Sequence, residues 1–188
     1  DVIALRDYLK KRNSSAKIIA KIENQEGLDN IHEITKASDI VMVARGDLGI
    51  ETDLADLPNI QRRIMYSTAK NGRRSIVATH LLESMIENPT PTRAEVTDVA
   101  NAIYEGADAV MLSGETTIGE HPIKCVEMLK RIAEKTEEFR TLGYEKFLQE
   151  KSDWQNIALA ARDLSSNIDA QGIVVITRSG ETANVISN

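Results

Sequence analysis

Short runs of apolar, mostly β-branched residues alternate along the chain with longer amphipathic segments. Four such runs occupy positions 17–22, 39–44, 75–79 and 108–113. Their apolar residues are continuous instead of alternating with polar ones, which is typical of parallel strands that are covered on both faces. Helical patterns lie between and after them, at about 27–36, 58–71, 94–105 and 122–140. The pattern therefore predicts four units, each a strand followed by a helix.

Capping signals support these helix boundaries. Gly72 and Gly106 follow two of the helices, where a left-handed residue is favoured. Thr92 and Glu95 form a capping box, in which the hydroxyl and the carboxylate satisfy each other's free backbone amides. Pro122 stands at a first helical position.

Alternation of strands and helices indicates parallel strands joined by right-handed crossovers. Two folds share this pattern, an open doubly wound sheet and a closed barrel. Polar residues stand at the C-terminal end of every run, which favours the barrel because its sites collect loops from several strands. A complete barrel takes about 250 residues, so residues 1–141 are expected to form an α/β domain that is half of one.

Residues 142–188 are expected to form a junction and the start of a second α/β domain. Ser152 and Gln155 make another capping box, which opens a helix predicted to end at about Asn167. A fifth apolar run, 172–177, predicts a further strand. The chain starts and stops inside helical patterns, whereas domains usually end at flexible segments, so we expect it to be a piece of a longer protein.

Composition and charge exclude several classes of protein. The net charge of −6 argues against a general surface for nucleic acid or anionic membrane. Cys125 is the only cysteine, so an internal disulfide is excluded and a reducing, cytoplasmic location is expected. No apolar run approaches the roughly 20 residues of a membrane span.

The ends of the first two strands carry the most informative polar residues. Lys21 and Glu23 share one face because strand side chains alternate with period two. Arg45 and Asp47 end the next run, and neighbouring strands lie about 4.8 Å apart, so both carboxylates can point into one space. Two carboxylates flanked by Lys21 and Arg45 predict a site for Mg²⁺ and phosphate, because Mg²⁺ completes its shell with substrate oxygens and water. A salt-bridge cluster at a barrel rim explains the same residues equally well.

Other loops offer weaker candidates. Gly46 and Gly49 bracket a turn whose free amides would suit a carboxylate or phosphate, although glycine turns are common. Thr79 is suited to binding substrate, relaying a proton or capping a helix. His80 is a candidate base, but packing histidines are more common. No Gly-x-Ser-x-Gly motif or spaced Ser/His/Asp set argues for acyl transfer.

Five stretches closely resemble pyruvate kinase in order and spacing. They are residues 21–27, 42–49, 78–85, 91–102 and 111–116. The likeness covers essentially the whole chain, and several long motifs in one order are far more specific than one short pattern. The resemblance implies that the four strands are the last four of a TIM-type (β/α)8 barrel. It also implies that residues 142–188 begin the C-terminal regulatory domain.

The resemblance further implies roles for individual residues. Glu23 and Asp47 would bind the catalytic Mg²⁺ or Mn²⁺, and Lys21 would stabilise the phosphoryl group in transit. The backbone of Gly46 and Asp47 and the hydroxyl of Thr79 would hold the substrate carboxylate.

Protonation of the enolate would depend on neighbouring loops. The resemblance places Thr79, with water near Ser113 and Glu115, on that proton route. His80 departs from the family, which usually has Gln at this position. Thr177, Ser179 and Thr182 resemble the loop that holds the phosphate of sugar-phosphate or nucleotide effectors.

The activity implied by the resemblance is the last step of glycolysis, in which phosphoenolpyruvate and ADP give pyruvate and ATP. The family also implies a requirement for K⁺, whose ligands would lie on the missing strands. It implies a homo-oligomer, which is a tetramer in the full-length family, and no nucleic acid or membrane partner is expected.

Two rival functions fit the pattern: a non-catalytic half-barrel that binds or regulates, and a metal-dependent aldolase or lyase. The long motifs at 45–49 and 79–85 argue against the lyase. With half the barrel missing, the isolated chain is expected to be inactive.

Overall fold

The structure, a computed structural model, describes residues 1–139, 142–144, 152–178 and 180–187. The chain divides into two units, Asp1–Phe147 and Leu148–Asn188.

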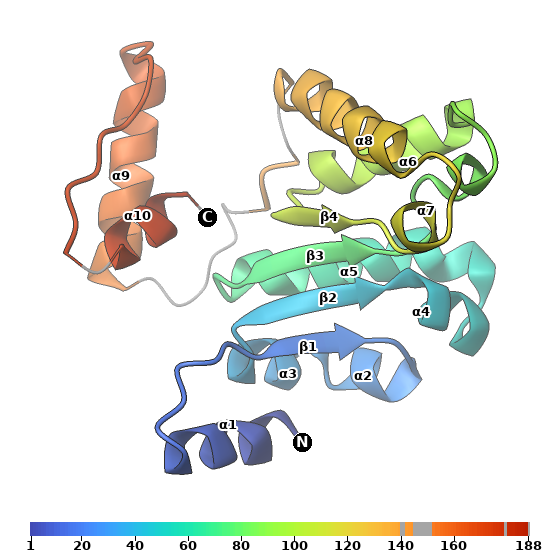
Figure 1. Cartoon of the computed structure of the whole chain (residues 1–188). Coiled ribbons are helices and arrows are strands. Elements are labelled where there is room, and N and C mark those ends of the chain that lie inside the picture. The colour runs from blue at the N-terminus through green and yellow to red at the C-terminus, as the bar shows by residue number, and fades with distance from the viewer. Residues whose placement is uncertain (140–141, 145–151, 179, 188) are drawn as a thin grey trace. The chain divides into compact units, whose positions relative to one another are not determined.

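The first unit is built on a sheet of four parallel strands in sequence order. The strands are β1 (Ile19–Ile22), β2 (Ile40–Ala44), β3 (Arg74–Ala78) and β4 (Ala109–Met111). Ile22 pairs with Val43, and Ala44 with Ala78, so the carboxyl ends of the strands meet at one edge (Figure 1). The prediction of a partial barrel is confirmed, and the barrel is not closed.

The helices of this unit include those that the pattern predicts after each strand. They are α1 (Val2–Lys11), α2 (Gln25–Asp29), α3 (Ile31–Ala37), α4 (Arg45–Glu51), α5 (Leu57–Lys70), α6 (Arg93–Tyr104), α7 (Gly114–Thr117) and α8 (Pro122–Glu137), with 3₁₀ turns η1 (Leu54–Asp56) and η2 (Glu83–Ile86). The segment predicted as one helix at 27–36 is two, because the chain bends at Asn30 between α2 and α3. The capping box of Thr92 and Glu95 is present at the start of α6.

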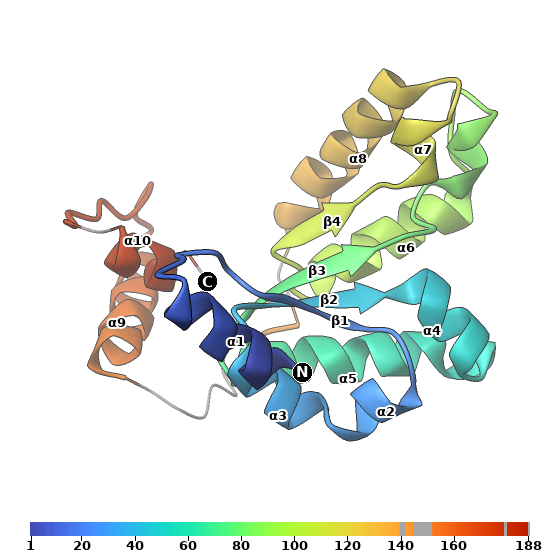
Figure 2. The same ribbon diagram turned by 60° about the horizontal axis from the view of Figure 1, so that its bottom comes forward.

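One face of the sheet carries the hydrophobic core. Ile22, Val41, Val43 and Val77 are buried on the helix-covered face, where they join residues of α5 and α6. Figures 1 and 2 show α3 and α5 running along this face. The opposite face is the one that a closed barrel would fill, and here Ile19 of β1 remains 45% exposed.

The second unit contains two helices among its described residues. They are α9 (Asp153–Asn167), which has the predicted capping box of Ser152 and Gln155, and α10 (Glu181–Ile186). The strand predicted at 172–177 is wrong, since these residues form no strand and the side chains of Val174 and Ile176 are more than 90% exposed. A strand needs a hydrogen-bonded neighbour, and the described residues of this unit offer none.

Among the helices that the structure describes, none has the length and apolar character needed to cross a membrane.

Candidate functional site

Three charged residues meet at the carboxyl end of β1 and β2. Lys21 lies on the open face of β1, Glu23 follows that strand, and Asp47 lies in the first turn of α4 directly after β2. The Lys21 Nζ atom is 2.6 Å from Glu23 Oε2 and 3.4 Å from Asp47 Oδ2. The structure therefore brings together the three residues that the sequence singled out.

This charged cluster is open to solvent. The side chains of Lys21, Glu23 and Asp47 are 51%, 42% and 56% exposed. The hydrogen bond to Glu23 is the largest cause that raises the pKa of Lys21, with a further contribution from Asp47. Ion pairs as exposed as these add little to stability. The expected salt bridges are thus present, but they contribute little to the stability of the fold.

The two carboxylates fit a divalent cation. Each has an oxygen within 3.4 Å of the same ammonium nitrogen, so both converge on one positive charge. A pair of carboxylates open to water is a donor set that Mg²⁺ uses. In the described part of the chain, no group of three or more His, Cys, Asp or Glu residues could hold a metal. An ion at Glu23 and Asp47 would take its other oxygens from substrate and water.

Arg45 does not flank this cluster, and that prediction is wrong. Its guanidinium is buried, with Nη1 donating to Asp98 Oδ1 at 2.9 Å and Nη2 donating to His80 O at 2.8 Å and to the second Asp98 oxygen. Side chains alternate along β2, so Arg45 leaves the strand on the same helix-covered face as Val43. Arg45 thereby joins α4 to α6 and to the turn after β3.

The turn after β3 has an unusual backbone. Thr79 and His80 have φ values of +70° and +52°, a left-handed region that is rare for residues other than glycine and rarest for β-branched ones. Such strained residues cluster at functional sites. The helix-capping reading of Thr79 is wrong, because η2 begins only at Glu83 and is preceded by Leu82.

The Thr79 hydroxyl links this turn to the start of α4. It accepts a hydrogen bond from Gly46 N at 2.8 Å and donates one to Ala78 O at 2.6 Å. The sequence suggested that the Gly46 amide would be free, but in the structure it is bonded to Thr79. A Cβ atom at Gly46 would lie 3.3 Å from Thr79 Oγ1 and 3.4 Å from His80 Cε1, so this close approach favours glycine. Gly49 lies inside α4 and does not bound the turn.

Ser113 and Glu115 lie beyond β4. Ser113 is half-buried, and its amide donates to Glu115 Oε2 at 2.8 Å. Glu115 is fully buried, and its other oxygen accepts from Leu82 N at 3.1 Å. These two residues are close to each other and to the turn that carries Thr79, but Glu115 has no contact with solvent.

The predicted effector loop is only partly described. The Thr177 hydroxyl accepts a hydrogen bond from Gly180 N at 3.1 Å, and Gly180 has a left-handed φ of +83° before α10. Thr182 lies in the first turn of α10. Ser179 lies outside the described residues. A phosphate-binding role for this loop stays a prediction.

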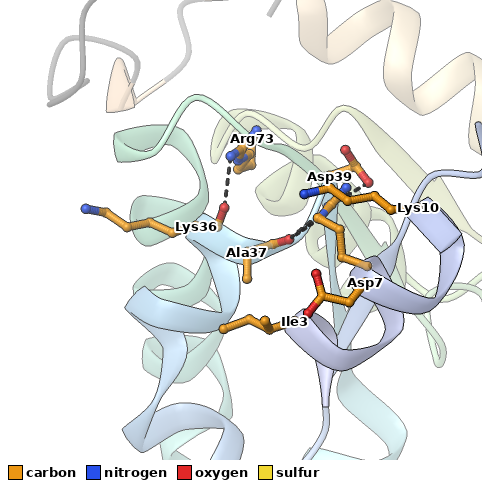
Figure 3. Close-up of a pocket in the computed structure, with 8 residues that line it drawn as sticks. Ile3, Asp7, Lys10, Lys36, Ala37, Asp39 and Arg73 are labelled. Atoms are coloured by element: carbon orange, nitrogen blue, oxygen red, sulfur yellow. Dashed lines mark hydrogen bonds and ion pairs between the residues drawn. The ribbon is translucent and has the colours of Figure 1, made fainter.

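A hollow lies at the opposite, amino-terminal end of the sheet from the charged cluster (Figure 3). This cavity of about 380 Å³ is lined by Ile3, Arg6, Asp7, Lys10, Lys36, Ala37, Asp39 and Arg73. Arg6 donates to Ala37 O at 2.8 Å and to Asp39 Oδ2 at 2.9 Å, and Asp39 also accepts from Ile18 N at 2.8 Å. These bonds connect α1 to the starts of β1 and β2, so the residues that line the hollow have a structural role in packing these elements together.

Sequence reasoning missed Asp98, which orients Arg45. The Asp98 side chain is 38% exposed and its partner lies 53 positions away in the sequence, so no local signal could have identified it.

Comparison with known proteins finds relatives that cover most or all of the chain. Residues 1–126 match the family model described as the barrel domain of pyruvate kinase. The pyruvate kinase of Methanocaldococcus jannaschii is 43% identical over 188 residues, which are all of this chain and 42% of that protein. The pyruvate kinase of Borreliella burgdorferi is 48% identical over 178 residues, 93% of this chain and 37% of that protein.

A solved structure has a closely similar fold. The crystal structure of a pyruvate kinase from Cryptosporidium parvum superimposes with a TM-score of 0.92 at 37% sequence identity, over 99% of this chain and 40% of that one. The chain thus spans about two fifths of the length of these relatives.

Proposed function

The chain belongs to the pyruvate kinase family, and from that premise we propose that it supplies the phosphoryl-handling half of an enzyme that converts phosphoenolpyruvate and ADP to pyruvate and ATP. The observation that carries the proposal is the convergence of Lys21, Glu23 and Asp47 at one open point beside the carboxyl ends of the strands. In barrels of this class the active site is formed at that edge.

Glu23 and Asp47 are proposed to hold Mg²⁺ or Mn²⁺. A divalent ion bound there supplies charge neutralisation at the phosphoryl and enolate oxygens. Lys21 now occupies the space between the two carboxylates, so its ammonium group would move to a phosphoryl oxygen when the site fills. A lysine amine is protonated at neutral pH without help from its neighbours, so the ammonium charge that such pairing requires is present. Phosphoryl transfer depends mainly on positioning and on charge neutralisation, and these residues supply both.

Gly46, Asp47 and Thr79 are proposed to hold the substrate carboxylate. The Gly46 amide donates to the Thr79 hydroxyl at 2.8 Å, and that hydroxyl donates to Ala78 O at 2.6 Å, so the two groups already lie side by side. A carboxylate oxygen that accepts from the Gly46 amide would release the Thr79 hydroxyl. That hydroxyl would then join the route that protonates the enolate, in the vicinity of Ser113 and Glu115.

Further expectations of the resemblance belong to the same proposal. They are a K⁺ requirement, a cytoplasmic homo-oligomer, and binding of an effector phosphate by Thr177, Ser179 and Thr182. The domain boundary near residue 141, with a regulatory domain after it, is proposed on the same basis. The matches to pyruvate kinases disfavour the aldolase or lyase alternative. A non-catalytic module of the same fold is the remaining rival.

A chimera tests the proposal. This chain would replace the aligned segment of the Methanocaldococcus jannaschii relative, because that alignment includes every residue of the chain. We expect the chimera to form pyruvate from phosphoenolpyruvate, with dependence on ADP and Mg²⁺, in an assay coupled to lactate dehydrogenase. The Lys21→Met chimera should retain metal binding and lose turnover. A folded chimera that binds metal without turnover would favour the non-catalytic module, and ADP-independent cleavage would favour a lyase.

A further inference from the structure

One fully buried carboxylate near the site has no cationic partner among the residues that the structure describes. Both oxygens of Glu115, on α7, accept hydrogen bonds from backbone amides, Leu82 N at 3.1 Å and Ser113 N at 2.8 Å. Across the described ranges, no lysine, arginine or histidine forms an ion pair with it. Burial of a charge is costly unless hydrogen bonds compensate for it. The two amides are therefore the reason that this carboxylate is tolerated here.

The two amides belong to different strand ends. Leu82 follows the strained turn after β3, and Ser113 follows β4. The backbone connection between β3 and β4 stops at the hydrogen bond from Thr79 N to Met111 O, which is 3.4 Å long. Beyond that point the Glu115 side chain continues the connection.

The segment held in this way carries the Thr79 hydroxyl. Thr79 and His80 have positive φ values, and such a conformation persists only where the surroundings enforce it. Arg45 holds the turn from one side through His80 O at 2.8 Å. Glu115 holds it from the other side through Leu82, whose side chain is also fully buried.

The geometry points to Glu115 as a positioning residue, which fixes the Thr79 turn against the end of β4 and does not itself carry the proton. This inference rests on the proposed function, because it assigns Thr79 a role in that reaction. A proton carrier must be reached by water or substrate, whereas the Glu115 side chain is fully buried and has both oxygens engaged with amides.

Two conservative variants of the chimera separate the two roles. Glu115→Gln keeps the length of the side chain and one acceptor oxygen but cannot titrate. Glu115→Asp keeps a titratable carboxylate but is one methylene too short to reach both amides. Positioning predicts that kcat is lower in Glu115→Asp than in Glu115→Gln, with a loss of about tenfold to 100-fold in the aspartate variant, since a misplacement of about 1 Å has an effect of that size. A proton carrier predicts the reverse order.

The control is Glu120→Gln, which makes the same charge change at an exposed position five residues later and should leave kcat and KM unchanged. The pH profile of the residual activity in Glu115→Gln should keep the wild-type shape. A lost limb in that profile, or a lower melting temperature with unchanged kcat and KM in both variants, would overturn the inference.

Amide hydrogen exchange gives a readout that does not depend on activity. Exchange should be at least about tenfold faster than in the unmodified chimera at one of the two amides, Leu82 or Ser113, in Glu115→Gln and at the amide or amides that the shorter side chain no longer reaches in Glu115→Asp, as expected when an amide loses its acceptor. Unchanged protection of both amides would contradict the positioning role even if the chimera were inactive. Absence of pyruvate formation with Glu115 intact would instead refute the proposed function.

Discussion

At the scale of single residues, the arrangement of Glu23 and Asp47 around one ammonium nitrogen makes a direct prediction. Asp47→Ala removes one of two proposed cation ligands, so Mn²⁺ affinity of the chimera should fall by at least about tenfold, or about 1.4 kcal/mol. Electron paramagnetic resonance of free Mn²⁺ measures this. Glu51→Gln, which also removes a negative charge from α4, is the matched control. Equal loss in both variants would mean that general charge, and not ligation, sets the affinity.

The Thr79 hydroxyl supports a second residue-scale prediction. Thr79→Val keeps the shape of the side chain but removes the bonds to Gly46 N and Ala78 O. We expect turnover of the chimera to fall by on the order of 100-fold, within the range that a proton-transfer group contributes, while Mn²⁺ affinity stays the same. Ketonisation of enolpyruvate and the coupled assay measure the two chemical steps. Wild-type rates of both would remove Thr79 from the mechanism.

Sequence alone located most of the candidate site, because period-two alternation and parallel strand ends dictate where Lys21, Glu23 and Asp47 meet. It failed for Arg45, whose neighbours in sequence do not reveal that its side chain leaves on the helix-covered face. It also gave no sign that the Gly46 amide would be engaged by Thr79. Both errors concern partners that are more than 30 residues away, which local patterns do not encode.

At the scale of elements, Arg45 and Asp98 connect α4 to α6. Removal of one partner from a buried pair costs about 3–5 kcal/mol, but the Asp98 side chain is 38% exposed, so solvent reduces the effect. We expect Arg45→Met to lower the free energy of unfolding of the chimera by about 1–3 kcal/mol. Urea unfolding measures this, and a double-mutant cycle with Asp98→Asn should show coupling. Strictly additive losses would mean that the pair does not link the two helices.

The start of α6 should make stability depend on pH. Burial alone would raise the pKa of Glu95, but hydrogen bonds from Ser84 and Thr92 outweigh it and lower the pKa. A carboxyl with a lowered folded-state pKa stabilises the protein above its unfolded value, and this contribution is lost as pH falls through the folded value. Unfolding free energy should therefore decline from about pH 4.5 downwards more steeply in the unmodified chimera than in Glu95→Gln. Parallel pH curves would contradict this assignment.

Helices and strands of the first unit were predictable because hydrophobic pattern and caps agree there. Thr92, Glu95 and Pro122 set the same boundaries in the sequence and in the structure. The prediction of a strand at 172–177 is wrong because local pattern does not decide whether a strand finds a partner. A pattern encodes the preference of a segment, but a strand exists only with a partner, and Val174 and Ile176 remain exposed without one.

At the scale of the whole molecule, the four strands of the first unit leave one apolar sheet face and two sheet edges without partners among the described residues. Ile19 is 45% exposed and Met111 is 36% exposed on this face. Unpaired edges favour association, and apolar surface left in water forgoes about 25 cal/mol per Å². We expect the isolated 188-residue chain to be inactive and to associate in sedimentation experiments. A stable, well-folded monomer would show that the open face is compatible with folding alone.

Complementation is the most direct test of the central claim, that this chain holds the phosphoryl-transfer residues of a half-barrel. The purified 188-residue chain would be mixed with the part of the Methanocaldococcus jannaschii relative that it does not match, and pyruvate formation would be followed with ADP and Mg²⁺. We expect no turnover from either part alone, but turnover from the complex of the two. The Lys21→Met substitution should abolish that turnover. A complex that sediments as one species but forms no pyruvate, or ordinary turnover by the chain alone, would contradict the account.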